Sequence, residues 1–202
     1  MRVLARDGYA GATVAAVARE AGLAQGLVHY HFASKSELLA AAIAQLSERL
    51  AQRVEQGALR DGRAASPRAD LHALLAAHVG LGPGADAAAV GAWVAIGAEA
   101  MRSPEVREVY ERELAAQITR VRGLVRRALT GEGRPPRRAA TITLAIVASI
   151  EGMYRIGVGA PAAIIAGSGA ATVRRLVDAL LDAEPTSASP ARRSAPEEAG
   201  PR

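Results

Sequence analysis

The chain has 202 residues, of which 50% are hydrophobic but only 3% aromatic, so alanine and aliphatic side chains must build its core. A chain of this length suits one or two small domains. The absence of cysteine excludes disulfide scaffolds and thiolate metal sites and suits a reducing cytoplasm. The net charge of +5 and the isoelectric point near 10.4 permit a nucleic-acid partner without demonstrating one.

Alanine-rich segments with helical periodicity and few β-branched residues predict an all-α protein of about nine helices. The N-terminus carries charges at Arg2, Arg6 and Asp7 and no apolar run, so we expect no signal peptide. The most apolar run, 139–150, contains threonine and serine and is too short to span a bilayer. We therefore expect a soluble cytoplasmic protein.

Two short helices around a tight turn, followed by the start of a longer helix, are predicted for residues 13–39. Thr13 can cap the first of them, and Gly22 can reverse the chain at its end. The second, 24–30, spans barely two turns and is unstable alone because helix nucleation is costly. Its neighbours must therefore hold it, and the candidate inward anchors are Leu23, Leu27 or Val28, and Phe32.

A helix, a glycine-containing turn and a short helix with one free face form the helix-turn-helix plan, in which the second helix enters the DNA major groove. An ordinary three-helix cluster without a nucleic-acid role is the alternative that geometry leaves open. Ser34 and Glu37 have the spacing of a capping box, which opens the next helix.

Residues 13–39 resemble the DNA-binding module of the TetR family of bacterial transcriptional regulators through the pattern T-V-x-x-V-A-x-E-A-G-L-x-x-G-L-V-H-Y-H-F-x-S-K-x-E-L-L. The segment G-L-V-H-Y-H-F is most similar to the choline-responsive BetI type. The resemblance implies a ligand-responsive repressor that binds a palindromic DNA operator as a homodimer. Residues 1–8 resemble only the end of the family's first helix, so we expect a weakened small domain and weakened DNA affinity.

The DNA-facing residues are expected to combine backbone contacts with base reading. Gln25 can pair with adenine, His29 can reach base edges, and Leu27 can pack against a thymine methyl group. Lys35, in the first turn of the next helix, is interpreted as a phosphate contact. From this chemistry and from the resemblance, the expected DNA contacts are Thr13, Ala15, Gln25, Gly26, Leu27, His29, Tyr30, His31, Ser34 and Lys35.

No catalytic or metal-binding pattern is visible. His29 and His31 are two positions apart, so on a helix they point to different sides, and no thiolate or carboxylate accompanies them. We expect neither a metal site nor a cofactor. No grouping of serine, histidine and carboxylate indicates an enzyme. The alternative function is a small-molecule-binding helical dimer whose DNA-binding module is degenerate.

Further helices are predicted at 34–56, 67–80, 86–101, 104–129, 138–156 and 170–183, with a polar connection at 57–68 and a short helix at 161–166. We place the DNA-binding domain, with its first helix truncated, at 1–45. The ligand-binding and dimerisation domain follows at 46–183, and a disordered tail at 184–202.

The helix predicted at 138–156 is apolar on nearly every face, which in so small a chain indicates burial against a second subunit. We expect a homodimer through this helix and the last one, about 138–183, because TetR-family dimers pair their last two long helices. A basic run, interpreted as a solvated face with a second nucleic-acid patch as the alternative, comprises Arg120, Arg122, Arg126, Arg127, Arg134, Arg137 and Arg138.

Aromatic and polar residues in the C-terminal helices are candidates for an effector pocket, with plain core packing as the alternative for each. They are His78, Trp93, Met101, Tyr110, Glu151, Met153 and Tyr154. Glu151, with Arg155 four positions on, is either half of a surface ion pair or a buried carboxylate that holds a cation beside an aromatic ring. The BetI likeness favours a small organic cation.

Overall fold

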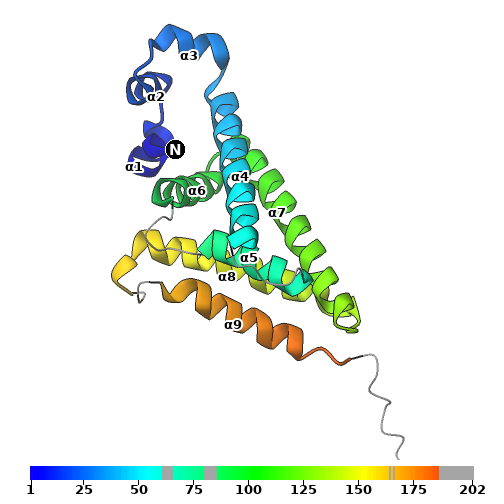
Figure 1. Cartoon of the computed structure of the whole chain (residues 1–202). Helices are drawn as coiled ribbons and strands as arrows, with labels where there is room; N and C mark the ends of the chain where they lie inside the picture. Colours follow the sequence, from blue (N-terminus) through cyan, green and yellow to red (C-terminus); the bar gives the residue numbers. More distant parts are fainter. Residues whose placement is uncertain (61–65, 80–85, 164, 166, 187–202) are drawn as a thin grey trace, which may run out of the picture.

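The computed structural model describes residues 1–60, 66–79, 86–163, 165 and 167–186, and these form helices without any strand. The expected all-α fold is confirmed (Figure 1). The nine α-helices in the described ranges are α1 (Arg2–Gly11), α2 (Val14–Ala21), α3 (Gln25–His31), α4 (Lys35–Arg60), α5 (Pro67–Val79), α6 (Ala87–Ala100), α7 (Pro104–Gly131), α8 (Ala139–Gly159) and α9 (Ser168–Asp182). Two short 3-10 turns, Pro136–Arg138 and Pro161–Ala163, flank α8.

The turns around α2 have the local chemistry that the sequence predicts. The Thr13 side chain accepts a hydrogen bond from the Ala16 N–H at 3.1 Å, which caps the helix. Gly22 ends it in the left-handed conformation, with a φ of 66°. Gly8, with a φ of 67°, interrupts α1 and turns the chain toward α2.

The long helix α4 carries the short helices at its N-terminal end (Figure 1). Its first turn is capped by Ser34, whose Oγ accepts from the Glu37 N–H at 3.0 Å. The Glu37 carboxylate accepts in return from the Ala33 N–H at 2.8 Å, one residue earlier than a standard capping box. The expected end at 56 and the connection beginning at 57 were wrong, because α4 continues to Arg60. Residues 61–65 lie outside the described part.

The apolar core of the first helices continues into the larger domain. Val3 and Leu4 of α1 are buried in the same cluster as Ala92 and Ile96 of α6. A second cluster joins α5, α7, α8 and α9 around residues such as Ile146. The expected boundary at 45 therefore falls within α4 and is not marked by a break in packing.

The apolar helix α8 is longer than its most apolar run. The segment Pro136–Gly159 has 24 residues and a mean hydropathy of 1.3, so by length and composition alone it could cross a membrane. The run 139–150 is thus part of a longer apolar segment, and core helices of soluble proteins meet the same criterion. Within one protomer α8 keeps an exposed apolar face: Leu144 is 64% exposed, and Ile156 and Val158 are exposed too.

The segment after α9 packs back onto the protein at its start. Glu184 is 6% exposed, and its carboxylate lies 3.8 Å from Nη1 of Arg138. Arg134 donates to the backbone carbonyl of Glu184. The expectation of a disordered tail from 184 is therefore wrong at its first residue, and residues 187–202 lie outside the described part.

Candidate nucleic-acid interface and ligand pocket

The short helix α3 presents a polar face on the outside of the molecule. Val28 is 5% exposed and anchors the helix, whereas Tyr30 is 84% exposed. Gln25 and His29 lie side by side on the outer face, with Nε2 of each separated by 3.5 Å. A large aromatic ring with so little cover on a short helix indicates a surface that meets a partner.

One expected inward anchor, Leu23, is wrong, and of the alternatives Leu27 and Val28 it is Val28 that is buried. Leu23 and Leu27 are both exposed, and Phe32 is only half-buried, so Val28 alone is fully buried among the four candidates. Two turns of helix carry too few residues for periodicity to fix the buried face. Leu27 is therefore exposed, as the expected contact with a base requires.

The expected backbone contacts lie around α3 at the ends of the neighbouring helices. Thr13 and Ser34 are exposed, and each hydroxyl oxygen already accepts a capping hydrogen bond. Because a hydroxyl that accepts keeps its proton, both can still donate to a phosphate oxygen. Ala15, Gly26 and His31 are also exposed.

Lys35 is held within the protein. Its Nζ lies 3.3 Å from the carbonyl oxygen of Ala10 and 4.0 Å from the centroid of the Tyr9 ring. These contacts tie the start of α4 to the last turn of α1. One of the three ammonium donors is thereby used, and two remain for a phosphate.

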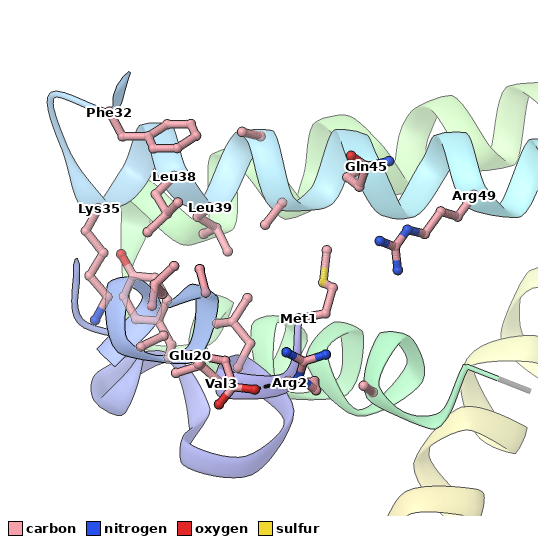
Figure 2. Close-up of a pocket in the computed structure, with 18 of the residues that line it drawn as sticks. Met1, Arg2, Val3, Glu20, Phe32, Lys35, Leu38, Leu39, Gln45 and Arg49 are labelled. Carbon is pink, nitrogen blue, oxygen red and sulfur yellow. Dashed lines mark hydrogen bonds and ion pairs between the residues drawn. The ribbon is translucent and has the colours of Figure 1, made fainter. Parts of the chain in front are cut away.

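A cavity of about 590 Å³ separates α1 and α2 from the first half of α4. Figure 2 shows Leu38 and Leu39 lining it from α4, with Met1 and Val3 on the opposite side. Arg2 and Arg6 both pair with Glu20, which joins α1 to α2 at the rim. The helices α1, α2 and α3 are therefore supported by a thin core, as the small size of this part of the chain predicts.

Three of the expected pocket residues converge between α6, α7 and α8. The Trp93 indole N–H donates to the two carboxylate oxygens of Glu151 at 3.0 and 3.1 Å, and the Tyr110 hydroxyl donates at 3.4 Å. The two aromatic rings lie 4.8 Å apart between centroids. With Met101 and Arg155 they line a cavity of about 360 Å³.

Glu151 is therefore a half-buried carboxylate and not half of a surface ion pair, since none of the ion pairs within the described ranges joins it to Arg155. Burial raises the pKa of the Glu151 carboxyl, and the hydrogen bonds from Trp93 and Tyr110 partly offset this rise. Burial and the Glu151 charge raise the pKa of Tyr110 to about 12, so its hydroxyl remains a donor. A carboxylate hydrogen-bonded to two aromatic side chains, whose rings are tilted by 37° to each other, is suited to an organic cation.

The remaining pocket candidates lie elsewhere. His78 and Tyr154 are buried together, with His78 Nδ1 2.7 Å from the Tyr154 hydroxyl. Burial, with the charges of Arg120 and Arg53, lowers the pKa of His78 to about 3, so the imidazole is neutral. Met153 packs against the core beside α9 and lines none of these cavities.

The basic run does not behave as one surface. Arg134 pairs with Glu132 and Asp182, and Arg138 pairs with Glu184. Arg120 lines a small chamber with His78, Tyr154, Arg53 and Gln117. The interpretation as a solvated face therefore fits the exposed remainder, Arg122, Arg126, Arg127 and Arg137.

Comparison with known proteins links this geometry to a family. Residues 1–42 match the sequence model of the bacterial regulatory proteins of the tetR family. Residues 67–182, more than half of the chain, match that of the C-terminal region of BetI-type transcriptional repressors. The chain belongs to the TetR family.

Its relatives include two TetR-family regulators. The HTH-type transcriptional regulator BetI of Agrobacterium fabrum is 31% identical over 158 residues, which are 76% of this chain and 70% of that protein. BetI of Rhizobium meliloti is 34% identical over 163 residues, covering 76% and 71%. A transcriptional regulator from Rhodococcus sp. Rha1 has 25% identity and a TM-score of 0.72, covering 90% of this chain and 91% of that chain. A regulator from Saccharomonospora viridis in complex with choline has the same fold, with 19% identity, a TM-score of 0.65 and coverage of 90% and 91%.

As a TetR-family member, the protein is a ligand-responsive, DNA-binding transcriptional regulator, and repression and dimerisation are typical of the family. Its relatives are regulators and not enzymes, and no group of three or more potential metal ligands occurs among the described residues. Sequence reasoning missed Arg53 and Gln117, because nothing near either residue in the chain indicates that α4 and α7 bring them together.

Proposed function

We propose that this protein represses transcription by placing α3 of each of two subunits in successive major grooves of an operator, and that a small organic cation bound beside Glu151 releases it. The observation that carries the proposal is the exposure of α3. Every residue of this helix except Val28 is exposed, and Val28 is buried against the rest of the protein. TetR-family membership gives this face its role.

Base reading falls to three residues of that face. Gln25 can pair bidentately with adenine, His29 is close enough to orient its amide, and Leu27 is exposed toward a thymine methyl group. Gly26 allows the backbone to approach, and Tyr30 adds a hydroxyl at the groove edge. Thr13, Ser34, His31 and Lys35 fix the register on phosphates, while Ala15 contributes only contact.

A salt titration of binding to DNA from beside the protein's own gene tests the reading role. Operator binding is expected at nanomolar affinity, with a steep fall as salt rises, because phosphate contacts release counterions. Binding that is weak and equal for operator and scrambled DNA would instead favour the alternative, a ligand-binding dimer with a degenerate DNA module.

The two subunits are proposed to pair through α8 and α9, within about 138–183. Leu144, Ile156 and Val158 of α8 and Leu176 of α9 are large apolar side chains left exposed on one protomer. A second subunit seated against α8 and α9 would cover these apolar side chains. The pairing would set the separation of the two α3 helices at about 34–36 Å or a multiple of it.

The effector is proposed to be a small quaternary ammonium compound, with choline as the probe. Glu151 supplies the charge, and Trp93 and Tyr110 supply ring faces at which such cations bind. Because α6, α7 and α8 surround this cavity, a cation there can favour one packing of the larger domain over another. If the cation binds more tightly to the packing that does not fit the operator, it lowers DNA affinity by the ratio of its two affinities.

The variant Glu151→Gln tests the effector site. Glutamine keeps an oxygen that accepts from Trp93 but removes the charge, so choline affinity should fall at least about tenfold. The matched control Glu111→Gln, on the exposed face of α7, should bind choline as the wild type does. Equal choline binding by all three proteins would contradict this site while leaving the DNA-reading proposal intact.

A further inference from the structure

A chamber between α4 and α7 holds hydrogen-bond donors that have no partner in the protein. The side chain of Gln117 is 7% exposed, and its Nε2 is buried without a hydrogen-bond partner. The Nε of Arg53, on α4, is likewise buried and unpaired. Both residues line the same chamber, of about 60 Å³, together with Arg120. Unpaired buried donors are costly, so a site that collects them is built for an acceptor.

The charges in this chamber favour an anion. Arg53 and Arg120 both line the chamber beside His78, and their charges help to lower the pKa of that imidazole. Within the described ranges neither arginine takes part in an ion pair. The chamber's one carboxylate, Glu113, accepts from the Ser47 hydroxyl at 3.4 Å and lies 3.9 Å from Arg112. With two guanidinium groups against one carboxylate, the chamber lining carries a net positive charge.

An apolar groove adjoins the chamber. It has a volume of about 520 Å³ and shares Ser47, Leu50, His78 and Arg120 with the chamber. Its walls are mostly aliphatic, from Leu50, Val54, Leu74 and Leu124, and its charged residues are Asp70, Arg127 and the shared Arg120. A volume in this range is typical of pockets for small organic ligands.

We propose that this chamber and groove form a second ligand site, separate from the Glu151 cavity, that takes an organic carboxylate with an apolar chain. The carboxylate lies among Arg53, Gln117 and Arg120, and the chain extends along Leu50 and Leu74. Guanidinium groups suit carboxylates because their donors match both oxygens. The neutral His78 stays paired with Tyr154 at the chamber wall.

This site also connects α4, whose N-terminal end follows α3 in the chain, to the larger domain. Arg53 lies on α4, and Gln117 and Arg120 lie on α7 (Figure 1). An anion that binds both helices fixes α4 against α7. If the proposed DNA-reading role of α3 holds, such a ligand changes operator affinity by its preference for one α4 position.

Direct binding of sodium octanoate, followed through Trp93, tests the site without DNA. Trp93 is the only tryptophan of the chain and lines the chamber. Octanoate should bind the wild type saturably. It should bind Arg120→Gln and Gln117→Glu at least about tenfold more weakly, since each loses or opposes a charge-assisted hydrogen bond. Arg122→Gln, on the exposed side of α7, is the matched control and should bind as the wild type does.

Binding of two other ligands, butyrate and inorganic phosphate, defines the ligand class. Butyrate should bind more weakly than octanoate, by up to about fourfold for each methylene that enters the groove. Inorganic phosphate that binds as well as octanoate would overturn the carboxylate assignment. Because Arg120 is exposed and Gln117 is buried, Arg120→Gln keeps the test valid should Gln117→Glu fail to fold.

The second site would be refuted if the wild type did not bind octanoate, or if Arg120→Gln bound octanoate as tightly as the wild type. The variant Glu151→Gln should keep octanoate binding while losing choline binding, so failure of this site and failure of the cation site are distinguishable. Octanoate binding without any effect on operator affinity would refute the link through α4.

Discussion

The buried pair of His78 and Tyr154 predicts a specific sensitivity to acid. In the folded protein the pKa of His78 is lowered from 6.5 to about 3, chiefly because burial disfavours the imidazolium, with Arg120 and Arg53 adding repulsion. The unfolded chain therefore binds a proton at this position between these two values, and the folded protein does not. Stability is complete above the unfolded pKa and is lost as pH falls from 6.5 toward 3.

The size of the loss follows from the two pKa values. At pH 5 protonation favours the unfolded state by roughly thirtyfold at this residue, which corresponds to about 2 kcal/mol. The variant His78→Gln removes the titrating group and keeps an amide that can bond to the Tyr154 hydroxyl. The wild type should therefore lose about 2 kcal/mol more unfolding free energy between pH 7 and pH 5 than the variant.

Urea unfolding followed by far-ultraviolet circular dichroism, at one protein concentration, measures both losses. The concentration must be fixed because dissociation of a dimer adds to the unfolding free energy. All other titrating groups are common to the two proteins, so their effects cancel in the comparison. Equal losses for the wild type and His78→Gln would show that His78 is accessible to protons in the folded state. Such a result would contradict the burial of His78 beside Tyr154.

Three other predictions concern the cap, the dimer and the effector. Thr13→Ala should lower the unfolding free energy by about 1 kcal/mol and Thr13→Ser should restore it, because Ala16 loses its capping acceptor; an unchanged melting temperature would argue against the cap. Leu144→Glu with Leu176→Glu should shift the protein from dimer to monomer in sedimentation velocity, since both side chains lie on the proposed interface, whereas a variant that stays dimeric would place the interface elsewhere. Choline affinity should fall as pH is lowered and should begin to fall above the usual glutamate pKa of 4.5, because burial raises the pKa of Glu151; an affinity independent of pH down to 4.5 would exclude this carboxylate.

The local signals of the sequence were the most reliable guide to the fold. Thr13, Gly22 and Ser34 act through hydrogen bonds and backbone angles within three or four residues of themselves, and each has the predicted role. The end of α4 was placed too early because Gly57 suggested a break. A glycine inside a helix costs only about 1 kcal/mol, and a long helix tolerates it.

Contacts between distant parts of the chain could be only partly predicted. Trp93, Tyr110 and Glu151 were chosen for their chemistry, but nothing in the sequence shows that they meet while Met153 packs elsewhere. The buried face of α3 was also undecided, because two helical turns allow Leu27 and Val28 to exchange roles. Packing against the neighbouring helices settles such choices, and packing depends on the whole chain.

The central claim is that the outward face of α3 reads the operator sequence. The most direct measurement is how far substitutions on this face lower the preference for operator over other DNA. Fluorescence anisotropy with operator and scrambled DNA, at one salt concentration, gives the ratio of the two affinities for each protein. The double variant Gln25→Ala, His29→Ala should lose at least roughly thirtyfold of this ratio, since each of the two base contacts contributes about 1–3 kcal/mol of discrimination. Gln52→Ala, a glutamine on the exposed side of α4, should leave the ratio unchanged. An unchanged ratio in the double variant would contradict the claim that α3 reads the operator.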